Sequence, residues 1–167
     1  ELVLENCTVS SSTAEFGAGL ANWQSARVVS SAISNNLAEH IGGGVWNRAG
    51  ARLEILNSTI VSNCAAFGGA IYSGGTFFVT NCTITANQAM GSFGSDEGKG
   101  GGIYFSSGSG VVVNSTLSGN VAYTPPLSPL GGIGGAVFVG GGALTFHQTT
   151  IANNEASRTA GGIYVLG

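Results

Sequence analysis

Charged side chains are scarce in this chain of 167 residues. Only 8% of the residues are Asp, Glu, Lys or Arg, whereas an ordinary globular protein has about 25%. The formal net charge is −3, and the five Lys and Arg residues are too few to form a basic patch, which argues against nucleic acid as a partner. A surface with so little charge favours close packing against other protein over free solution.

Long apolar runs and clustered metal ligands are also missing. No window approaches the roughly 18 apolar residues of a membrane-spanning helix, so we expect no transmembrane segment. The cysteines Cys7, Cys64 and Cys82 form no CxxC motif and no cluster with His40 or His147. We therefore expect three small thiols, no metal site and no cofactor.

What the chain has instead is one phrase repeated six times. An apolar residue is followed three positions later by Asn and five positions later by Ala, and then a Gly pair precedes Ile or Val; the first copy has Ser12 in place of Asn and Gly17-Ala18-Gly19-Leu20 in place of the Gly pair and its apolar residue. The apolar residue after the Gly pair recurs at Leu20, Val45, Ile71, Ile103, Val137 and Ile163. The steps between these positions are 25, 26, 32, 34 and 26 residues, which indicates a repeat near 25 residues with two insertions.

Each repeat contains three short runs rich in β-branched and aromatic residues, such as Leu53–Ile55, Thr59–Val61 and Ala70–Tyr72. No stretch has the sustained apolar spacing of a helix. The pattern predicts an all-β fold, a right-handed single-stranded parallel β-helix (solenoid) of about six coils with three short strands each. We expect residues 1–167 to be a single domain, either a segment of a longer protein or a filament subunit.

Stacked coils place equivalent residues in columns. We expect one interior column at Leu4, Val28, Ile55, Val79, Val112 and Phe146. We expect a second at Val9, Ile33, Ile60, Ile84, Leu117 and Ile151, and a third at the six residues that follow the Gly pairs. The Gly pairs themselves would relieve crowding where the chain bends into the last strand of a coil.

A polar column accompanies these apolar ones. It is a structural asparagine ladder, opened by Ser12 and continued by Asn36, Asn63, Asn87, Asn120 and Asn154. Each Asn is expected to occupy a turn, because Asn tolerates the left-handed backbone, and to bond the next Asn along the stack.

The repeat also resembles a known group. The phrase Ile84-Thr85-Ala86-Asn87-Gln88-Ala89, followed by Gly100-Gly101-Gly102-Ile103-Tyr104, resembles the repeats of chlamydial polymorphic outer-membrane proteins. It is equally similar to the bacterial right-handed β-helix repeat proteins of the pectate-lyase-like superfamily. The resemblance covers nearly the whole chain, and it implies an extracellular or cell-surface location. It implies no single activity, since such repeats occur in adhesins, autotransporter passengers and polysaccharide-active enzymes.

The enzymes of this group provide the alternative function, a polysaccharide lyase or hydrolase. Resemblance to polygalacturonases would require clustered aspartates, but Asp96 is the only Asp in the chain. The glutamates fall in different columns, at Glu1, Glu5, Glu15, Glu39, Glu54, Glu97 and Glu155. General acid–base catalysis needs groups that converge on one cleft. We therefore predict no catalytic residues and a protein that is not an enzyme, with only a surface ion-pair cluster expected at Arg27, Arg52 and Glu54.

The two insertions are the strongest functional lead. They span residues 90–99 and 123–133, and both leave the coil between the Asn turn and the Gly pair, so they should protrude side by side. All three prolines lie in the second insertion, where they would stiffen the loop. We predict a binding surface on these loops, made of Phe93, Asp96, Glu97, Tyr123, Leu127 and Leu130.

Two further columns are open to more than one interpretation. Asn6, Asn57, Asn81 and Asn114 each begin an Asn-x-Thr sequon, which would be glycosylated only in a secretory host and only if exposed. The Thr column that follows (Thr8, Thr59, Thr83, Thr116 and Thr150, interrupted by Ala32) fits an ice lattice, and it also follows from the strand preference of Thr.

Together these observations predict a non-catalytic, extracellular structural or adhesive β-helix. Its expected partners are other protein copies or a larger assembly, or glycans. The apolar edge strands at Leu2–Leu4 and Ile163–Val165 have no polar, proline-rich or helical segment that would protect them from pairing. We therefore expect further coils or neighbouring copies in a filament to cover them.

Overall fold

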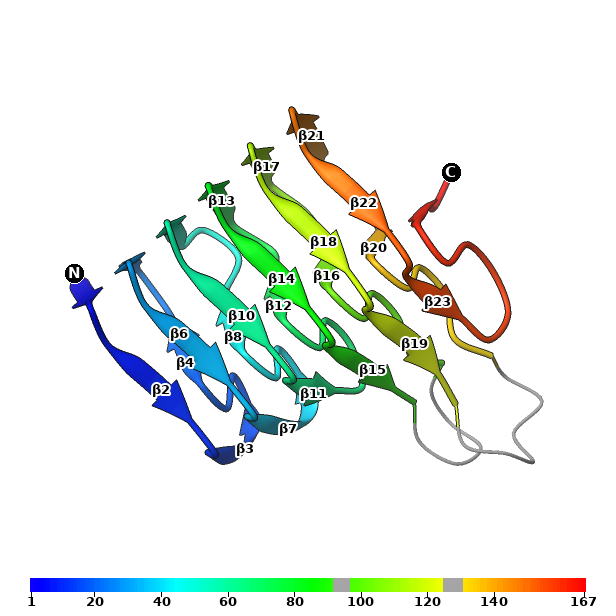
Figure 1. The fold of residues 1–167 in the computed structure, drawn as a ribbon, viewed down its shortest axis with the longest axis horizontal. Helices are drawn as coiled ribbons and strands as arrows, with labels where there is room; N and C mark the ends of the chain where they lie inside the picture. Colours follow the sequence, from blue (N-terminus) through cyan, green and yellow to red (C-terminus); the bar gives the residue numbers. More distant parts are fainter. Residues whose placement is uncertain (92–96, 125–130) are drawn as a thin grey trace.

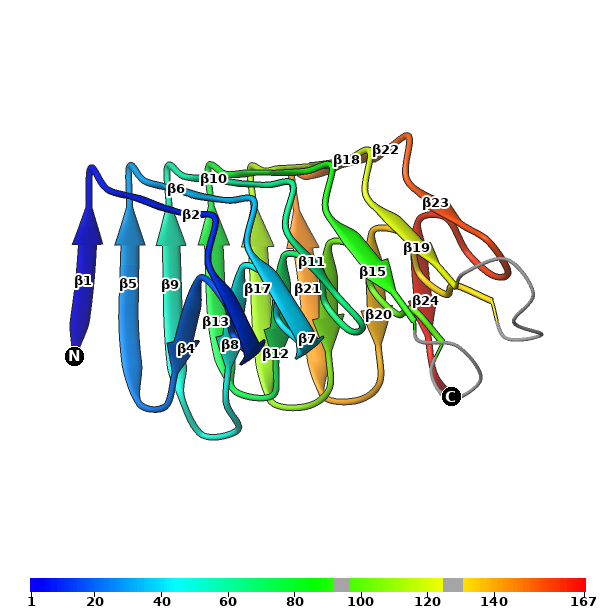
Figure 2. The same cartoon turned by 90° about the horizontal axis from the view of Figure 1, so that it is seen from below.

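The computed structural model describes residues 1–91, 97–124 and 131–167, which form a parallel β-helix with no α-helix in these ranges. The chain winds through six coils, and the strands of successive coils stack into four parallel sheets of six strands each (Figure 1). The two ends of the chain lie at opposite ends of the stack (Figure 2).

Every coil contributes one strand to each sheet. The first sheet contains β1 (Leu2–Glu5), β5 (Ser25–Val29), β9 (Arg52–Leu56), β13 (Thr76–Thr80), β17 (Ser109–Val113) and β21 (Ala143–His147). The second contains β2 (Thr8–Ser10), β6 (Ala32–Ser34), β10 (Thr59–Val61), β14 (Thr83–Thr85), β18 (Thr116–Ser118) and β22 (Thr150–Ala152). The third contains β3 (Thr13–Phe16), β7 (Leu37–Ile41), β11 (Cys64–Ala65), β15 (Gln88–Met90), β19 (Val121–Tyr123) and β23 (Glu155–Ala156). The fourth contains β4 (Leu20–Asn22), β8 (Val45–Asn47), β12 (Ile71–Ser73), β16 (Ile103–Phe105), β20 (Val137–Val139) and β24 (Ile163–Val165).

The predicted parallel β-helix of six coils is confirmed, but each coil has four strands where the sequence predicted three. The additional strands are those of the third sheet. They are two to five residues long, and each contains the small Ala that ends the repeated phrase. Because this Ala interrupts any run of large β-branched residues, the propensity pattern does not reveal these strands.

The three predicted apolar columns form the core. The strand register places Leu4 beside Val28 and Val28 beside Ile55, and the same alignment continues through all six coils in the first, second and fourth sheets. In the inner coils these residues are fully buried. Burial of each large aliphatic side chain stabilises the fold by roughly 1.5–3 kcal/mol.

The predicted asparagine ladder runs beside this core. Asn36, Asn63, Asn87 and Asn120 are buried, and each Nδ2 donates to the Oδ1 of the next Asn at 2.9–3.0 Å. The backbone N–H of each Asn donates to that same Oδ1. Among the described residues no buried side-chain nitrogen or oxygen lacks a partner, so the ladder fully satisfies this polar column.

The expected left-handed conformation of the ladder asparagines is wrong. Positive φ angles of 54–61° occur one position earlier, at Ser11, Asn35, Ser62, Ala86, Gly119 and Asn153. The residue before each ladder Asn therefore makes the sharp turn. The ladder Asn itself is selected for its hydrogen bonds, because its amide can donate and accept at once.

A second ladder, not predicted from the sequence, follows the column of Cys7, Ser31, Ser58, Cys82 and Ser115, in which all but the half-buried Cys7 are buried. The backbone N–H of Ser31 donates to Ser58 Oγ at 3.0 Å, and that of Ser58 donates to Cys82 Sγ at 3.5 Å. The N–H of Cys82 donates in turn to Ser115 Oγ at 3.1 Å. Cys7 and Cys82 thus share a column, three coils apart, and all three cysteines are free thiols.

The Gly pairs relieve crowding, as expected. A Cβ on Gly43, Gly69, Gly101 or Gly135 would lie less than 3.0 Å from a backbone carbonyl oxygen of the neighbouring coil. Only Gly lets successive coils approach this closely at the bend into the fourth sheet.

Candidate binding face

Both insertions leave the helix at the third sheet. The first follows β15 and the second follows β19, and Met90 is in register with Tyr123 at the point of departure. Where the chain returns, Lys99 forms a parallel bridge with Ile133. The bases of the insertions therefore lie side by side on adjacent coils, as predicted. The predicted binding residues Phe93, Asp96, Leu127 and Leu130 lie outside the described residues.

Glu97, another predicted binding residue, makes ion pairs at the end of the first insertion. Its carboxylate pairs with Lys99 at 3.2 Å and also with Arg158 in the last coil. The Lys99 ammonium lies 5.5 Å from the ring centroid of Phe138 and 5.9 Å from that of Phe67. These contacts tie the returning chain to the fourth sheet and to coil six.

Tyr123, the remaining predicted binding residue, holds a neighbouring side chain in place. Its hydroxyl donates to Met90 Sδ at 3.0 Å. Burial, and secondarily the nearby Cys64, raises the pKa of Tyr123, so the phenol stays protonated and keeps its donor at neutral pH.

Beside these bases the outer face of the third sheet is hollowed into a groove of about 700 Å³. Its lining residues come from the first four coils and are Thr13, Ala14, Leu37, Ala38, Glu39, His40, Cys64, Ala65, Ala66, Met90 and Gly91. We call this groove, together with the insertion bases Met90 and Tyr123, the binding face.

The hollow arises because the third coil has small side chains. Cys64 lies in register between Leu37 and Gln88, and Ala65 and Ala66 beside it are buried. Leu37 on one side is 48% exposed and Met90 on the other is 39% exposed. Two large apolar side chains thus stand as walls above a floor of small ones.

Negative charge gathers at the N-terminal end of the groove. Glu39 and His40 line it, and His40 Nε2 lies 4.0 Å from Glu15 Oε1. None of the lining residues is Lys or Arg. At the centre, burial raises the pKa of the Cys64 thiol, so Cys64 presents a neutral, weakly polar surface at neutral pH.

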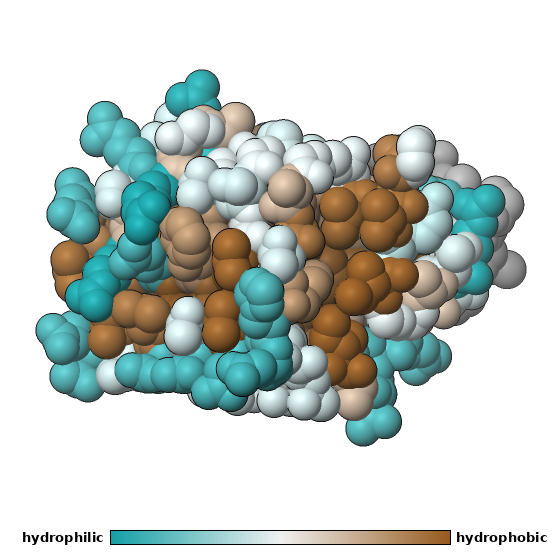
Figure 3. Space-filling view, turned by 90° about the horizontal axis from the view of Figure 1, so that it is seen from above, coloured by the Kyte–Doolittle hydropathy of each residue, from teal (hydrophilic) through white to brown (hydrophobic). Residues whose placement is uncertain are grey.

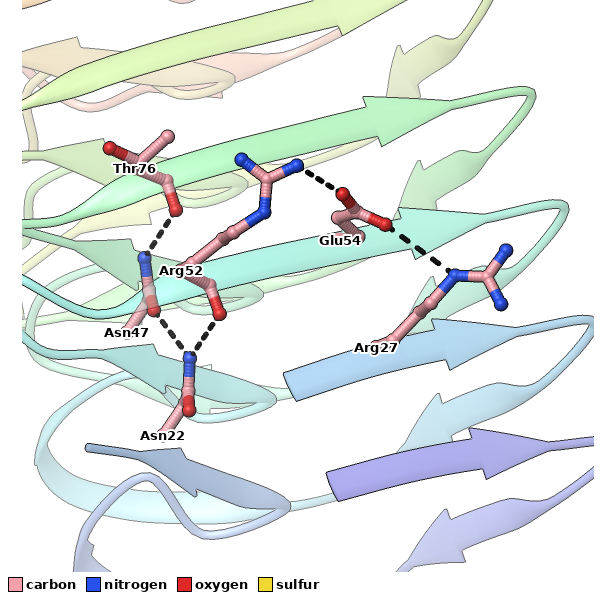
Figure 4. Close-up of polar contacts among 6 residues, drawn as sticks. All are labelled: Asn22, Arg27, Asn47, Arg52, Glu54 and Thr76. Atoms are coloured by element: carbon pink, nitrogen blue, oxygen red, sulfur yellow. Dashed lines mark hydrogen bonds and ion pairs between the residues drawn. The ribbon is translucent and has the colours of Figure 1, made fainter. Parts of the chain in front are cut away.

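The predicted ion-pair cluster is present on the first sheet, away from the groove. Glu54 pairs with Arg52 on its own strand and with Arg27 of the preceding coil at 3.4 Å (Figure 4). Asn22 donates to Asn47 Oδ1 at 2.8 Å beside it. All three charged side chains are at least a quarter exposed, so the cluster is a surface one, worth little to stability.

The surface of the first sheet has no other concentration of charge. Hydrophobic patches alternate with hydrophilic groups on this side of the molecule, which is the side seen from above (Figure 3).

The described ranges contain no group of three or more His, Cys, Asp or Glu side chains that could hold a metal ion. Nor do they contain a helix long and apolar enough to cross a membrane.

An aromatic column runs along the outside of the fourth sheet. Tyr72, Tyr104, Phe138 and Tyr164 stack with ring centroids 4.8–5.2 Å apart and interplanar angles of 5–18°. Both faces of Tyr104 and of Phe138 are occupied by neighbouring rings, so the interior of the column presents ring edges. Flat stacking platforms for a ligand are therefore not available there.

The sequon asparagines occupy one exposed column. Asn6, Asn57, Asn81 and Asn114 are exposed and have positive φ angles of 46–55°. Asn81 Nδ2 donates to Asn57 Oδ1 at 3.0 Å, and Asn114 Nδ2 donates to Asn81 Oδ1 at 2.8 Å. The exposure that glycosylation requires is met at all four.

The groove was not predicted from the sequence. The sequence signal for it is a contrast in side-chain size within one column, where the small Cys64 lies between Leu37 and Gln88. This contrast becomes informative only when the column is known to face outward.

A family model described as "Right handed beta helix region" matches residues 1–167. No curated protein and no solved structure matches the chain.

Proposed function

The chain belongs to the right-handed β-helix family, and from that premise we propose that it is a non-catalytic structural or adhesive module, extracellular or at the cell surface, that contacts protein or glycan partners. The fold serves both enzymes and binding proteins, so the function must be argued from a site. The binding face supports the proposal.

The observation that carries the proposal is the coincidence of three features on the third sheet. The groove, the bases of both insertions, and the exposed walls Leu37 and Met90 all lie on it. Exposed apolar side chains around a concave surface are typical of interaction sites. Loops that project from one face of a solenoid commonly form its binding side.

The test is to place a charge on the groove wall. We expect Leu37→Asp to lower binding to the partner at least tenfold, because a carboxylate would have to be desolvated against the apolar occupant. Thr83→Asp, at an exposed site on the second sheet, is the matched control and should leave binding unchanged. Equal binding by the two variants would contradict the proposal.

The alternative is a carbohydrate-active enzyme, and one observation favours it. Glu39 and His40 both line the groove, where a carboxylate and an imidazole could share proton transfer. Both are exposed, and we propose that they are not catalytic, because no second acidic residue lines the groove. Measurable turnover of pectin or alginate, abolished by Glu39→Gln, would establish the enzyme instead.

We also propose that the end coils contact further protein. Leu2, Val3, Val165 and Leu166 are 42–64% exposed at the first and last coils of these 167 residues. Open strand edges with apolar side chains pair readily with another chain. More coils of the same polypeptide, or neighbouring copies in a filament, would cover them. Sedimentation at rising concentration tests the filament, and Tyr164→Lys should shorten any fibres while the inner coils stay folded.

A further inference from the structure

The groove has a chemistry that selects among the possible partners. Eight of its eleven lining residues are Ala, Gly, Leu, Met or Cys, and the three polar ones are Thr13, Glu39 and His40. Its lining includes no Phe, Tyr or Trp ring and no amide side chain. A sugar would therefore find no Phe, Tyr or Trp ring to stack on, and its hydroxyl groups would meet only three polar side chains, all of them in the first two coils. An apolar side chain, by contrast, would fit between the two walls.

The charge at one end of the groove adds a second requirement. Glu39 lines the groove, and Glu15 lies in the preceding coil beside His40. Among the described residues Glu39 makes no ion pair with Lys or Arg, and no cation lines the groove. A positively charged group at this end would therefore be attracted to the two carboxylates, and more so at low salt.

The spacing of these two subsites suits an extended peptide. The hollow above Cys64 is one coil from Glu39 and two coils from Glu15, which is about 4.8 Å and 9.6 Å at the usual strand spacing. In an extended chain, residues i and i+2 point to the same side and are about 6.6 Å apart. A basic residue placed two positions from an apolar one would then reach the carboxylates and the hollow together.

Building on the proposed binding function, we propose that the groove binds an extended segment of a partner protein that carries Lys or Arg two residues from Leu, Ile or Met. The apolar side chain lies over Cys64 and Ala66, between Leu37 and Met90. The cation lies between Glu15 and Glu39. The Tyr123 hydroxyl donates a hydrogen bond to Met90 Sδ and thereby holds Met90, the wall farther from Glu15 and Glu39, in place.

The experiment uses a fluorescent, capped heptapeptide of serine and threonine with one arginine two positions before one leucine. Its binding to the full chain is followed by fluorescence anisotropy. We expect the affinity to fall at least tenfold when arginine and leucine are made adjacent, because they then point to opposite sides. We expect it to fall about fivefold in Glu39→Gln, as for loss of one exposed ion pair. Glu155→Gln, on the same sheet but two coils from the groove, should have no effect.

Two substitutions at the floor complete the test. Cys64→Phe fills the hollow and should abolish peptide binding, whereas Cys64→Ser keeps the volume and should preserve it. Equal affinity for the two arginine–leucine spacings, or binding that survives Cys64→Phe, would overturn the proposed occupant. If the peptide fails to bind but Cys64→Phe still removes binding of a glycan polymer, the occupant is wrong and the binding face stands. If Cys64→Phe and Leu37→Asp change no interaction at all, both proposals fail.

Discussion

Replacement of Asn87 by Ala tests whether the asparagine ladder holds the coils together. The Asn87 side chain accepts from the backbone N–H and the Nδ2 of Asn63, at 2.9 and 3.0 Å. Its Nδ2 donates to the carbonyls of Ile60 and Thr85 and to Asn120 Oδ1, at 2.9–3.0 Å. Five hydrogen bonds disappear together in Asn87→Ala.

The expected loss of stability follows from burial. The backbone N–H of Asn63 loses its acceptor inside the protein, which costs about 1–3 kcal/mol, and the other bonds contribute roughly 0.5–1.5 kcal/mol each. Some of these partners keep a second bond, so we expect a decrease of about 4 kcal/mol in the free energy of unfolding. Asn154→Ala at the half-buried sixth coil is the matched control, and it should cost only about 1–2 kcal/mol because water can replace the lost bonds.

Urea unfolding followed by circular dichroism measures the free energy of unfolding of both variants. An unchanged m value, which is the slope of this free energy against urea concentration, is the check that the variants are comparable. Asn87→Asp tests the direction of the pH dependence. Burial would raise the pKa of the new carboxyl in the folded state, so the loss in the free energy of unfolding should be small near pH 4 and should grow as the pH rises toward 7. A loss below 1 kcal/mol in Asn87→Ala, or no difference from Asn154→Ala, would refute the view that the ladder stabilises the stack.

Three other predictions concern single columns. Cys82→Ser should unfold within about 1 kcal/mol of the wild type in urea, because Ser fits its ladder, whereas Cys82→Ala should lose about 1–3 kcal/mol by stripping the acceptor from the Ser58 N–H. Burial raises the pKa of Cys82, so the folded state keeps the thiol protonated to a higher pH than the unfolded state does. The free energy of unfolding should therefore fall as the pH rises through the ordinary thiol range, and Cys82→Ser should reduce this pH dependence. Gly69→Ala should lose several kcal/mol on thermal unfolding, because its Cβ would clash with two backbone oxygens, whereas Gly162→Ala has open space and should be neutral. Tyr104→Leu should cost about 1–3 kcal/mol from its two stacked contacts, and an unchanged melting temperature would count against them.

Column register was the property most accessible from the sequence. Because parallel coils align equivalent residues, reading Ile33, Ile60 and Ile84 as one column was enough to predict their pairing, and the structure confirms it. The third strand of each coil was missed, since strands such as Cys64–Ala65 are too short and have side chains too small to show a strand pattern. The left-handed position was placed one residue late, because Asn suits a left-handed turn and an amide ladder equally well.

The candidate site was less accessible. The departure of both insertions from one face follows from their common place in the repeat, so that part was predictable. The groove depends on the size of Cys64 relative to Leu37 in the preceding coil, and this outward-facing column belongs to the strands that the sequence did not reveal. Glu97 was predicted as a binding residue, and its pairing with Arg158 crosses two coils by a route that no periodicity encodes.

The two buried ladders share a polarity. In both, the N–H of one coil donates to the side chain of the following coil, from Ser12 toward Asn154 and from Cys7 toward Ser115. The first coil therefore offers side-chain acceptors, and the last offers backbone donors. Any added coil can continue the ladders only in head-to-tail orientation, because two first coils facing each other would set acceptor against acceptor. The coil stack is therefore directional: an end-to-end contact that continued the ladders would have to be head-to-tail, and a two-fold dimer through the ends would be disfavoured.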